Sequence, residues 1–286
     1  MARKSRSKTE SETAQKTSFT ENSVEKKALL SKEDFLKKFK ISQKTFMSSK
    51  IKWIDLVKIH ESYVASQDLF QNIATTLISK FLTSDAKDAG VHSVRFRLKN
   101  PESVIEKIIR KRLEGKVTKA VTVKNYTNEI TDLIGIRILH VFKDDWFGIH
   151  NYIQNCQFKF IEIPKVYYRK GDEKHFIDEC KKNGCVTEVH PKAYRSIHYI
   201  VNPHPQNKVC FAEIQVRTVF EDGWSEIDHK LRYASKKTKR HALDRYLLAL
   251  NRIAGSADEI GSIIKSRQIE LRREESEKQI DNKRSK

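Results

Sequence analysis

Two kinds of segment follow one another between residues 91 and 233. In one kind apolar and polar residues alternate, and in the other apolar residues recur with the period of a helix. Strands are predicted over 91–99, 133–142, 158–168, 196–202 and 208–216, and helices over 101–113, 144–156 and 219–233. Strands that alternate with helices bury an apolar sheet face under those helices. The sequence therefore predicts one α/β (α+β) domain, built on a mixed β-sheet flanked by helices.

Helical period also fills the sequence on both sides of this core. Residues 28–90 are predicted to form an N-terminal helical region whose first helix begins after Ser31, and residues 234–286 a C-terminal helical extension and tail. Residues 1–27 hold nine Ser or Thr and seven Lys or Arg with few apolar residues, which predicts a disordered basic arm. The polar stretch 169–192 is predicted to be a long loop.

The charge of the chain favours polyanionic partners. Its 56 Lys and Arg outnumber 37 Asp and Glu, so the formal net charge is +19. Such a surface attracts nucleotides or RNA, although a well-solvated basic surface is the alternative. No run approaches the roughly 20 apolar residues of a spanning helix, and the first ten residues lack an apolar signal core. With four scattered cysteines, the sequence predicts a reduced, cytoplasmic protein without a membrane partner.

A cationic motif begins the core, in the segment RFRLKNPESVIEKIIRK. Strand alternation places the Arg and Lys residues of the predicted strand on one face, and Asn100 with Pro101 then begins a helix whose first turn offers free N–H groups. Strand and helix cations could together clamp a polyphosphate, and a solvated strand edge and helix are the alternative. The candidate residues are Arg97, Lys99, Ser103, Lys107 and Arg110.

Two acidic residues are candidates for catalysis. Asp132 directly precedes an apolar strand, where a carboxylate can hold Mg²⁺ on a substrate phosphate, or can simply be a turn residue. In FAEIQVRT, Glu213, Gln215 and Arg217 alternate with apolar residues. That polar strand face could line a catalytic site or face solvent.

Further along, Tyr194 lies in a loop before a strand, with His198 four residues later. A loop tyrosine can stack on a nucleobase, or can pack at the beginning of the strand. His175, Cys180, Cys185 and His190 are four possible zinc ligands spaced five apart. That spacing matches no common zinc finger, so ordinary loop residues are favoured.

Five segments together resemble a known family. RLKNPESVIEK, DLIGIRI, YRSIHYIV, AEIQVRT and WSEIDHKLRY occur in the order found in the synthetase domain of RelA/SpoT proteins, the alarmone synthetases. The resemblance covers residues 91–233 and implies a nucleotidyltransferase-like sheet. It also implies a GTP diphosphokinase, which transfers the β,γ-pyrophosphate of ATP to the 3′-hydroxyl of GDP or GTP and yields (p)ppGpp and AMP. The region before residue 91 is too short for the family's hydrolase domain, so a small synthetase-only member is expected.

The same resemblance implies a role for each candidate. The five residues of the cationic motif would hold the ATP phosphates, Asp132 would bind Mg²⁺, and Glu213 would assist the metal or act as the base on the 3′-hydroxyl. Tyr194 would stack on the acceptor guanine, with His198 and Gln215 near the acceptor phosphates or ribose.

The acceptor loop departs from the family pattern, because Ala193 stands where a glycine is usual. A toxin-like member that pyrophosphorylates the tRNA 3′ end or adenine nucleotides is therefore an alternative. A non-catalytic nucleotide or RNA sensor is a second alternative. Many small members form tetramers, which makes a homo-oligomer compatible with this sequence.

Overall fold

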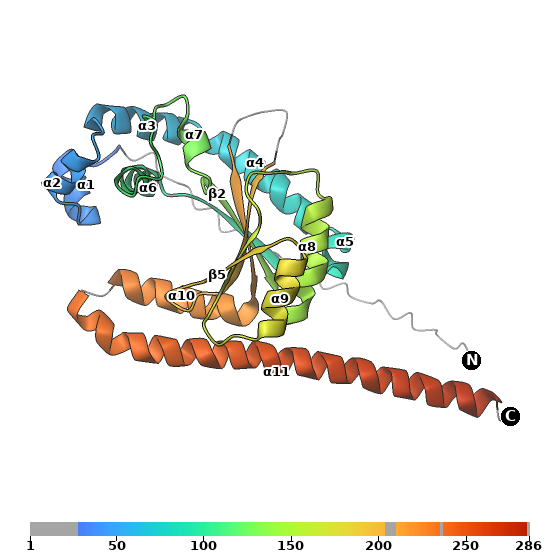
Figure 1. The fold of residues 1–286 in the computed structure, drawn as a ribbon. Coiled ribbons are helices and arrows are strands. Elements are labelled where there is room, and N and C mark those ends of the chain that lie inside the picture. The colour runs from blue at the N-terminus through green and yellow to red at the C-terminus, as the bar shows by residue number, and fades with distance from the viewer. Residues whose placement is uncertain (1–27, 204–209, 235–236, 285–286) are drawn as a thin grey trace, which may run out of the picture.

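A mixed β-sheet forms the centre of the computed structural model, which describes residues 28–203, 210–234 and 237–284 (Figure 1). Seven strands make up the sheet. Six follow the order β1 (Ser93–Leu98), β2 (Ile134–His140), β7 (Ala212–Thr218), β6 (Ser196–Asn202), β4 (Lys165–Tyr168) and β5 (Val186–Val189), and β3 (Lys159–Phe160) pairs with β6. The pairs β2–β7 and β4–β5 are parallel and the others antiparallel. The predicted mixed α/β fold is confirmed.

Helices cover both sides of the sheet. Those that precede β1 are α1 (Lys32–Phe39), α2 (Gln43–Ser48), α3 (Trp53–Ala65), α4 (Gln67–Phe81) and α5 (Ser84–Asp88). Those that follow are α6 (Pro101–Leu113), α7 (Tyr126–Glu129), the short 3₁₀ helix η1 (Lys143–Asp145), α8 (Trp146–Asn155), α9 (Lys174–Lys182), α10 (Val219–Ala234) and α11 (Lys237–Arg284). In Figure 1, α4, α8 and α9 lie on one side of the sheet, and α6 and α10 on the other. No described helix is both long enough and apolar enough to cross a membrane.

The apolar face of the sheet forms the core. Ile136 and Ile214 are paired on the neighbouring strands β2 and β7, and both are fully buried. Phe70 from α4 and Trp146 from α8 belong to the same apolar cluster. Because strand residues alternate between faces, burial of this set leaves the intervening polar residues on the opposite face.

Strand register collects those polar residues into rows. In one row, Arg97 on β1 is opposite Gly135 on β2, which is opposite Glu213 on β7. In the next row, Arg137 pairs with Gln215, which pairs with His198 on β6. Residues that are distant in sequence thus share one face of the sheet.

Local signals fix the beginning of α6 beside this face. The Asn100 side chain accepts hydrogen bonds from the backbone N–H groups of Glu102 and Ser103, and Pro101 occupies the first turn, where it costs no hydrogen bond. The Tyr63 hydroxyl on α3 donates to the Lys99 carbonyl at 2.6 Å. The N-terminal helices therefore hold the end of β1 in place.

Two local predictions are wrong. The predicted strand 158–168 is interrupted, and both pieces pair with β6. Pro164, which has no N–H to donate, directly precedes β4. The stretch 169–192 is not simply a loop, since it contains α9 and β5. Its only buried α9 residues are Ile177 and Cys180, so the apolar signal of this helix is weak in the sequence.

Three predicted segments include residues outside the description, and one of them is the C-terminal extension 234–286, of which residues 235–236 and 285–286 are not described. The arm 1–27 lies outside it entirely, and the strand predicted from 208 begins at Ala212 among described residues. The predicted domain boundaries remain predictions.

Candidate active site

Asp132 lies just before β2, between two lysines. Lys99 Nζ, at the end of β1, and Lys107 Nζ, on α6, are each 2.8 Å from Asp132 Oδ2. Burial acts to raise the pKa of Asp132, but the charges and hydrogen bonds of Lys107 and Lys99 outweigh it, so the pKa is lowered. The other carboxylate oxygen, Oδ1, is buried, and no described residue forms a hydrogen bond with it. This atom is available to a ligand.

Glu213 is an ionised, fully hydrogen-bonded carboxylate on β7. His198 Nδ1 donates to Oε1 at 3.2 Å, and Gln215 Nε2 donates to Oε2 at 2.6 Å. Burial acts to raise its pKa, yet His198, Gln215 and the charge of Lys107 lower it to about 2. The positive charge of Lys107 therefore lowers the pKa of both Asp132 and Glu213.

Gly135 keeps the space between Arg97 and Glu213 open. A Cβ at Gly135 would lie 3.6 Å from Arg97 Cγ and 3.8 Å from Arg97 Nε. The Arg97 side chain thus lies alongside the glycine, in the row that leads to Glu213. A larger residue would fill the strip of sheet between the cation and the acid.

The remaining residues of the cationic motif differ in whether they contact Asp132. Ser103 lies in the first turn of α6. Arg110 pairs with Glu106 and Glu114 of the neighbouring turns, each at 3.3 Å, and no described contact joins it to Asp132. Of the five candidates, Lys99 and Lys107 are therefore the two in contact with the acid.

Sequence reasoning missed Lys111, one turn after Lys107. Its Nζ donates to the Glu129 carbonyl at 2.6 Å. Burial, together with the charge of Lys107, lowers its pKa. The i, i+4 spacing from Lys107 was the available signal. Lys111 attaches α6 to the segment that leads into Asp132.

A hydrogen-bonded chain connects Tyr194 to Glu213. The Tyr194 hydroxyl is 3.2 Å from His198 Nε2, and His198 in turn donates to Glu213. The Tyr194 ring also lies 5.2 Å from the His190 ring and 6.3 Å from the Tyr167 ring. Tyr194 thus belongs to an aromatic cluster instead of projecting from a free loop.

A buried network around Arg217 lies at one end of the polar face. The sequence pattern predicted only part of this network. Arg217 is 3% exposed, lies 4.8 Å from the Tyr194 ring centroid and donates to the Tyr194 hydroxyl. Asp222 on α10 lies 2.8 Å from Arg95, 2.9 Å from Arg137 and 3.6 Å from Arg217. The alternation that marks Glu213 and Gln215 extends to Arg217, but no local pattern pairs Arg137 with Asp222.

Comparison with known proteins assigns the family. The family model described as a region found in RelA / SpoT proteins matches residues 96–238, half of the chain. This chain belongs to the RelA/SpoT family. The GTP pyrophosphokinase YwaC of Bacillus subtilis is 31% identical to it over 147 residues, an alignment that covers 50% of this chain and 59% of YwaC. The RelA/SpoT-family chain thus spans about three fifths of that relative's length.

This RelA/SpoT-family chain is also similar to solved structures. A GTP pyrophosphokinase family protein from Streptococcus pneumoniae superposes with a TM-score of 0.51 at 21% identity, over 74% of this chain and 93% of that one. The small alarmone synthetase 1 of Bacillus subtilis gives a TM-score of 0.49 at 18% identity, over 73% of this chain and 95% of that one. The first likeness supports the mixed α/β fold.

The donor atoms of the RelA/SpoT-family chain fit one kind of metal site. Among the residues that the structure describes, no three His, Cys, Asp or Glu side chains are grouped so as to hold a metal ion. Mg²⁺, however, commonly uses one or two carboxylates and completes its shell with substrate phosphates and water. The unpartnered Oδ1 of Asp132 fits that pattern.

The zinc alternative gains no support from the cysteines. Cys180 and Cys185 belong to the apolar core, and burial raises the pKa of Cys180 to about 12 and that of Cys185 to about 11. Both thiols pack as small apolar side chains.

Proposed function

We propose that this RelA/SpoT-family protein transfers the β,γ-pyrophosphate of ATP to the 3′-hydroxyl of GDP or GTP, giving (p)ppGpp and AMP. The observation that carries the proposal is the position of Asp132, held between Lys99 and Lys107 within the field that also acts on Glu213. Pyrophosphoryl transfer asks for little covalent chemistry from the protein. It requires two polyanions to be aligned and their charge to be screened.

In this proposal the donor binds over the cationic motif. Lys99 and Lys107 exchange part of their contact with Asp132 for contacts with the ATP phosphates. Arg97 approaches from β1, two residues before Lys99, and Ser103 offers its hydroxyl at the N-terminus of α6, where free N–H groups favour anions. Arg110 joins them only by releasing its pairs on α6.

Asp132 would hold Mg²⁺ through Oδ1, and Glu213 is the second candidate ligand. When bound, the metal screens the phosphate charge and polarises the phosphoryl group under attack. Asp132 needs no rearrangement for this role, because Oδ1 has no competing hydrogen bond.

The acceptor binds on the other side of Glu213. Tyr194 stacks on the guanine, while His198 and Gln215 contact the ribose or phosphates, as the family resemblance implies. Glu213 then accepts the 3′-hydroxyl proton or ligates the metal. Either role requires it to exchange a hydrogen bond with His198 or Gln215 for one with substrate.

An acceptor assay tests this proposal. Purified protein, Mg²⁺ and ATP labelled in the β,γ-phosphates are incubated in parallel with GDP, GTP, ATP and tRNA. Label on GDP or GTP supports the proposal. Label on tRNA or ATP alone replaces it with the toxin-like alternative, and nucleotide binding without transfer to any acceptor favours the sensor.

Variants test the assigned roles. Asp132→Asn and Glu213→Gln are expected to abolish transfer while the near-UV circular dichroism and melting temperature stay close to those of the parent protein. Asp88→Asn, on the short helix α5, is the matched control and should retain activity. Full activity in Asp132→Asn would refute the assignment.

We also propose that the protein acts in the cytoplasm, where its nucleotide substrates are abundant, and as a homo-oligomer. Tyr246, Ile253, Ile260, Ile264 and Leu271 lie on one face of α11 at helical spacing and are 43–65% exposed. A second copy of the chain could bury this stripe. Ile260→Glu should lower the mass measured by sedimentation, whereas Ile269→Glu, on another face of α11, should not.

A further inference from the structure

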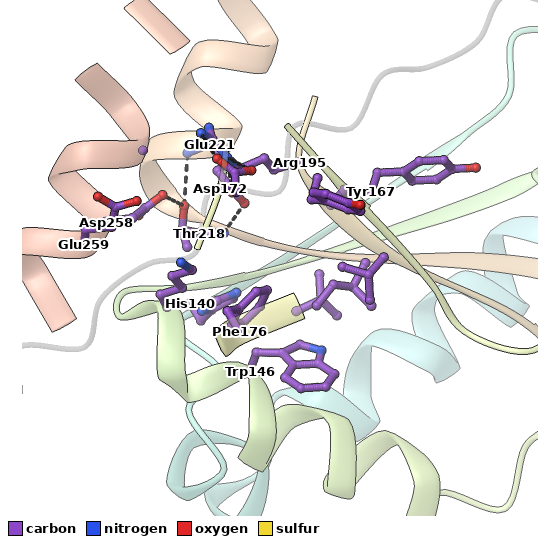
Figure 2. Close-up of a pocket in the computed structure, with 17 residues that line it drawn as sticks. His140, Trp146, Tyr167, Asp172, Phe176, Arg195, Thr218, Glu221, Asp258 and Glu259 are labelled. Carbon is purple, nitrogen blue, oxygen red and sulfur yellow. Dashed lines mark hydrogen bonds and ion pairs between the residues drawn. The ribbon is translucent and has the colours of Figure 1, made fainter. Parts of the chain in front are cut away.

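A pocket lies at the end of β2 and β7 that is farther from Asp132. Figure 2 shows this pocket in close-up. The space between its lining atoms is about 570 Å³, a volume that includes open solvent at the mouth of the pocket. His140 and Thr218 line it, and they are the last residues of the parallel strands β2 and β7. Thr218 is five residues beyond Glu213, or roughly 16 Å along the strand. The pocket includes neither Asp132 nor Glu213.

The pocket has an apolar floor and an acidic wall. Trp146 and Phe176 lie together on one side in Figure 2, and Ile197 and Val216 are also part of the lining. Four acidic residues from separate parts of the chain form the wall. They are Asp172 from the segment between β4 and α9, Glu221 from α10, and Asp258 and Glu259 from α11.

Two of the basic groups in the pocket already have acidic partners. Arg195 donates to both carboxylate oxygens of Asp172, each at 2.8 Å. Lys143 Nζ lies 3.2 Å from Glu173. Glu221 approaches a cation only distantly, at 4.0 Å from Arg195 Nε. The pocket acids Glu221, Asp258 and Glu259 therefore outnumber the cations available to them among the described residues.

Asp258 carries a buried atom without a partner. It is 3% exposed, and its Oδ2 accepts a hydrogen bond from the Thr218 hydroxyl at 2.8 Å. Oδ1 is buried and has no hydrogen-bond partner within the described part of the chain. Buried carboxylate oxygens are normally paired, so this atom marks a position where a donor is missing.

We propose that this pocket binds a small organic cation, an amidinium, guanidinium or primary ammonium group on a flat apolar body. The charged head donates to Asp258 Oδ1 near Glu221, and the body packs against Phe176, whose ring lies 5.8 Å from the ring of the fully buried Trp146. An aromatic floor favours such a body and also attracts its charge. The acidic wall disfavours phosphates, which separates this ligand from the nucleotides of the proposed reaction. No described group of three ligating side chains suits a metal ion here.

The state of Asp258 agrees with a missing cation. Burial and the neighbouring Glu221 raise the pKa of Asp258 to about 8, against the opposing effects of Thr218, Arg195 and Lys143. Asp172, Glu259 and His140 also line the pocket. The raised pKa thus favours a proton on Asp258, which a cationic head would displace into solvent.

Calorimetric titration of the full-length protein tests the proposal. The probes are benzamidine, its neutral isostere benzamide, and N-acetyl-arginine amide, which represents an arginine side chain of a peptide. We expect benzamidine or the arginine derivative to bind at least tenfold more tightly than benzamide. The tighter of the two tells whether a free cation or a peptide side chain is the source. Affinity should rise several-fold from pH 7 to 8.5, as Asp258 loses its proton more easily.

Two variants keep the test decisive. Asp258→Asn removes the charge at nearly unchanged shape and should weaken binding at least tenfold. Glu259→Gln, at the exposed rim of the pocket, should fold normally and weaken binding about twofold to threefold. Glu275→Gln, farther along α11, is the control and should bind like the parent protein. Equal binding of benzamide, undiminished binding by Asp258→Asn, or no binding of either cation would overturn the proposal. Pyrophosphate transfer is measured separately, so the two proposals can fail independently.

Discussion

Lys107 offers the sharpest test of the candidate active site, because it acts on both acids. Its Nζ is 2.8 Å from Asp132 Oδ2, and its charge contributes to the low pKa of Glu213. Its side chain is only 16% exposed, so solvent screens these interactions weakly. Lys107→Met keeps the length and apolar stem of the side chain but removes the charge.

The expected loss follows from one charge-assisted contact. A hydrogen bond to a charged group contributes about 1.5–3 kcal/mol. If the contact to the phosphates is realised in the transition state, kcat/KM should fall about 10- to 150-fold. The fold should persist, since Lys99 still pairs with Asp132 and the apolar side of α6 is unchanged.

Steady-state transfer with ATP varied at saturating acceptor measures this effect. Lys116→Met is the matched control, because Lys116 is 65% exposed just beyond the same helix and pairs with Glu114. It should stay within twofold of the parent protein. A Lys107→Met enzyme with kcat/KM within threefold of the parent, and a normal melting temperature, would refute the proposed phosphate site.

Three further predictions concern packing and pH. Gly135→Val should lower kcat/KM at least tenfold with little change in melting temperature, because its methyl groups would occupy the strip beside Arg97; full activity would contradict this role. Gly148→Ala should reduce the free energy of unfolding by about 2–4 kcal/mol, because its Cβ would lie 2.4 Å from the Ala89 carbonyl oxygen. Urea titration measures this loss, and an unchanged midpoint would contradict that contact. Asp258 binds its proton more tightly when folded than when unfolded, so its contribution to the free energy of unfolding should be lost as pH rises from about 4 to 8. The parent protein should therefore lose stability relative to Asp258→Asn over that range, and two parallel curves would contradict the raised pKa.

Much of the architecture follows from local sequence. The helix predicted over 101–113 and the strand predicted over 196–202 match α6 and β6 residue for residue. Asn100 and Pro101 define the helix start chemically, and period-two alternation identifies the buried face of each strand. The same alternation places Glu213 and Gln215 on one face before any fold is known.

The prediction was weakest where apolar signals were short. In the stretch 169–192, helix α9 buries two residues and β5 is largely exposed, so charged side chains obscured both elements. Their identity depends on pairing, because β5 forms a parallel ladder with β4 across α9. A four-residue strand has too little local pattern to be recognised without its partner.

The sequence by itself determined which residue types are available and which face of each element they occupy, because side-chain direction follows the local helix or strand period. Tertiary structure decided which of those faces meet. Pairing of β2 with β7 brings Gly135 beside Glu213, and the packing of α6 brings Lys107 to Asp132. It also places Asp258 of α11 against Thr218 at the end of β7. Such contacts join residues from about 25 to about 80 positions apart. Hydrophobic burial and strand pairing over those separations produce no periodic pattern in the sequence.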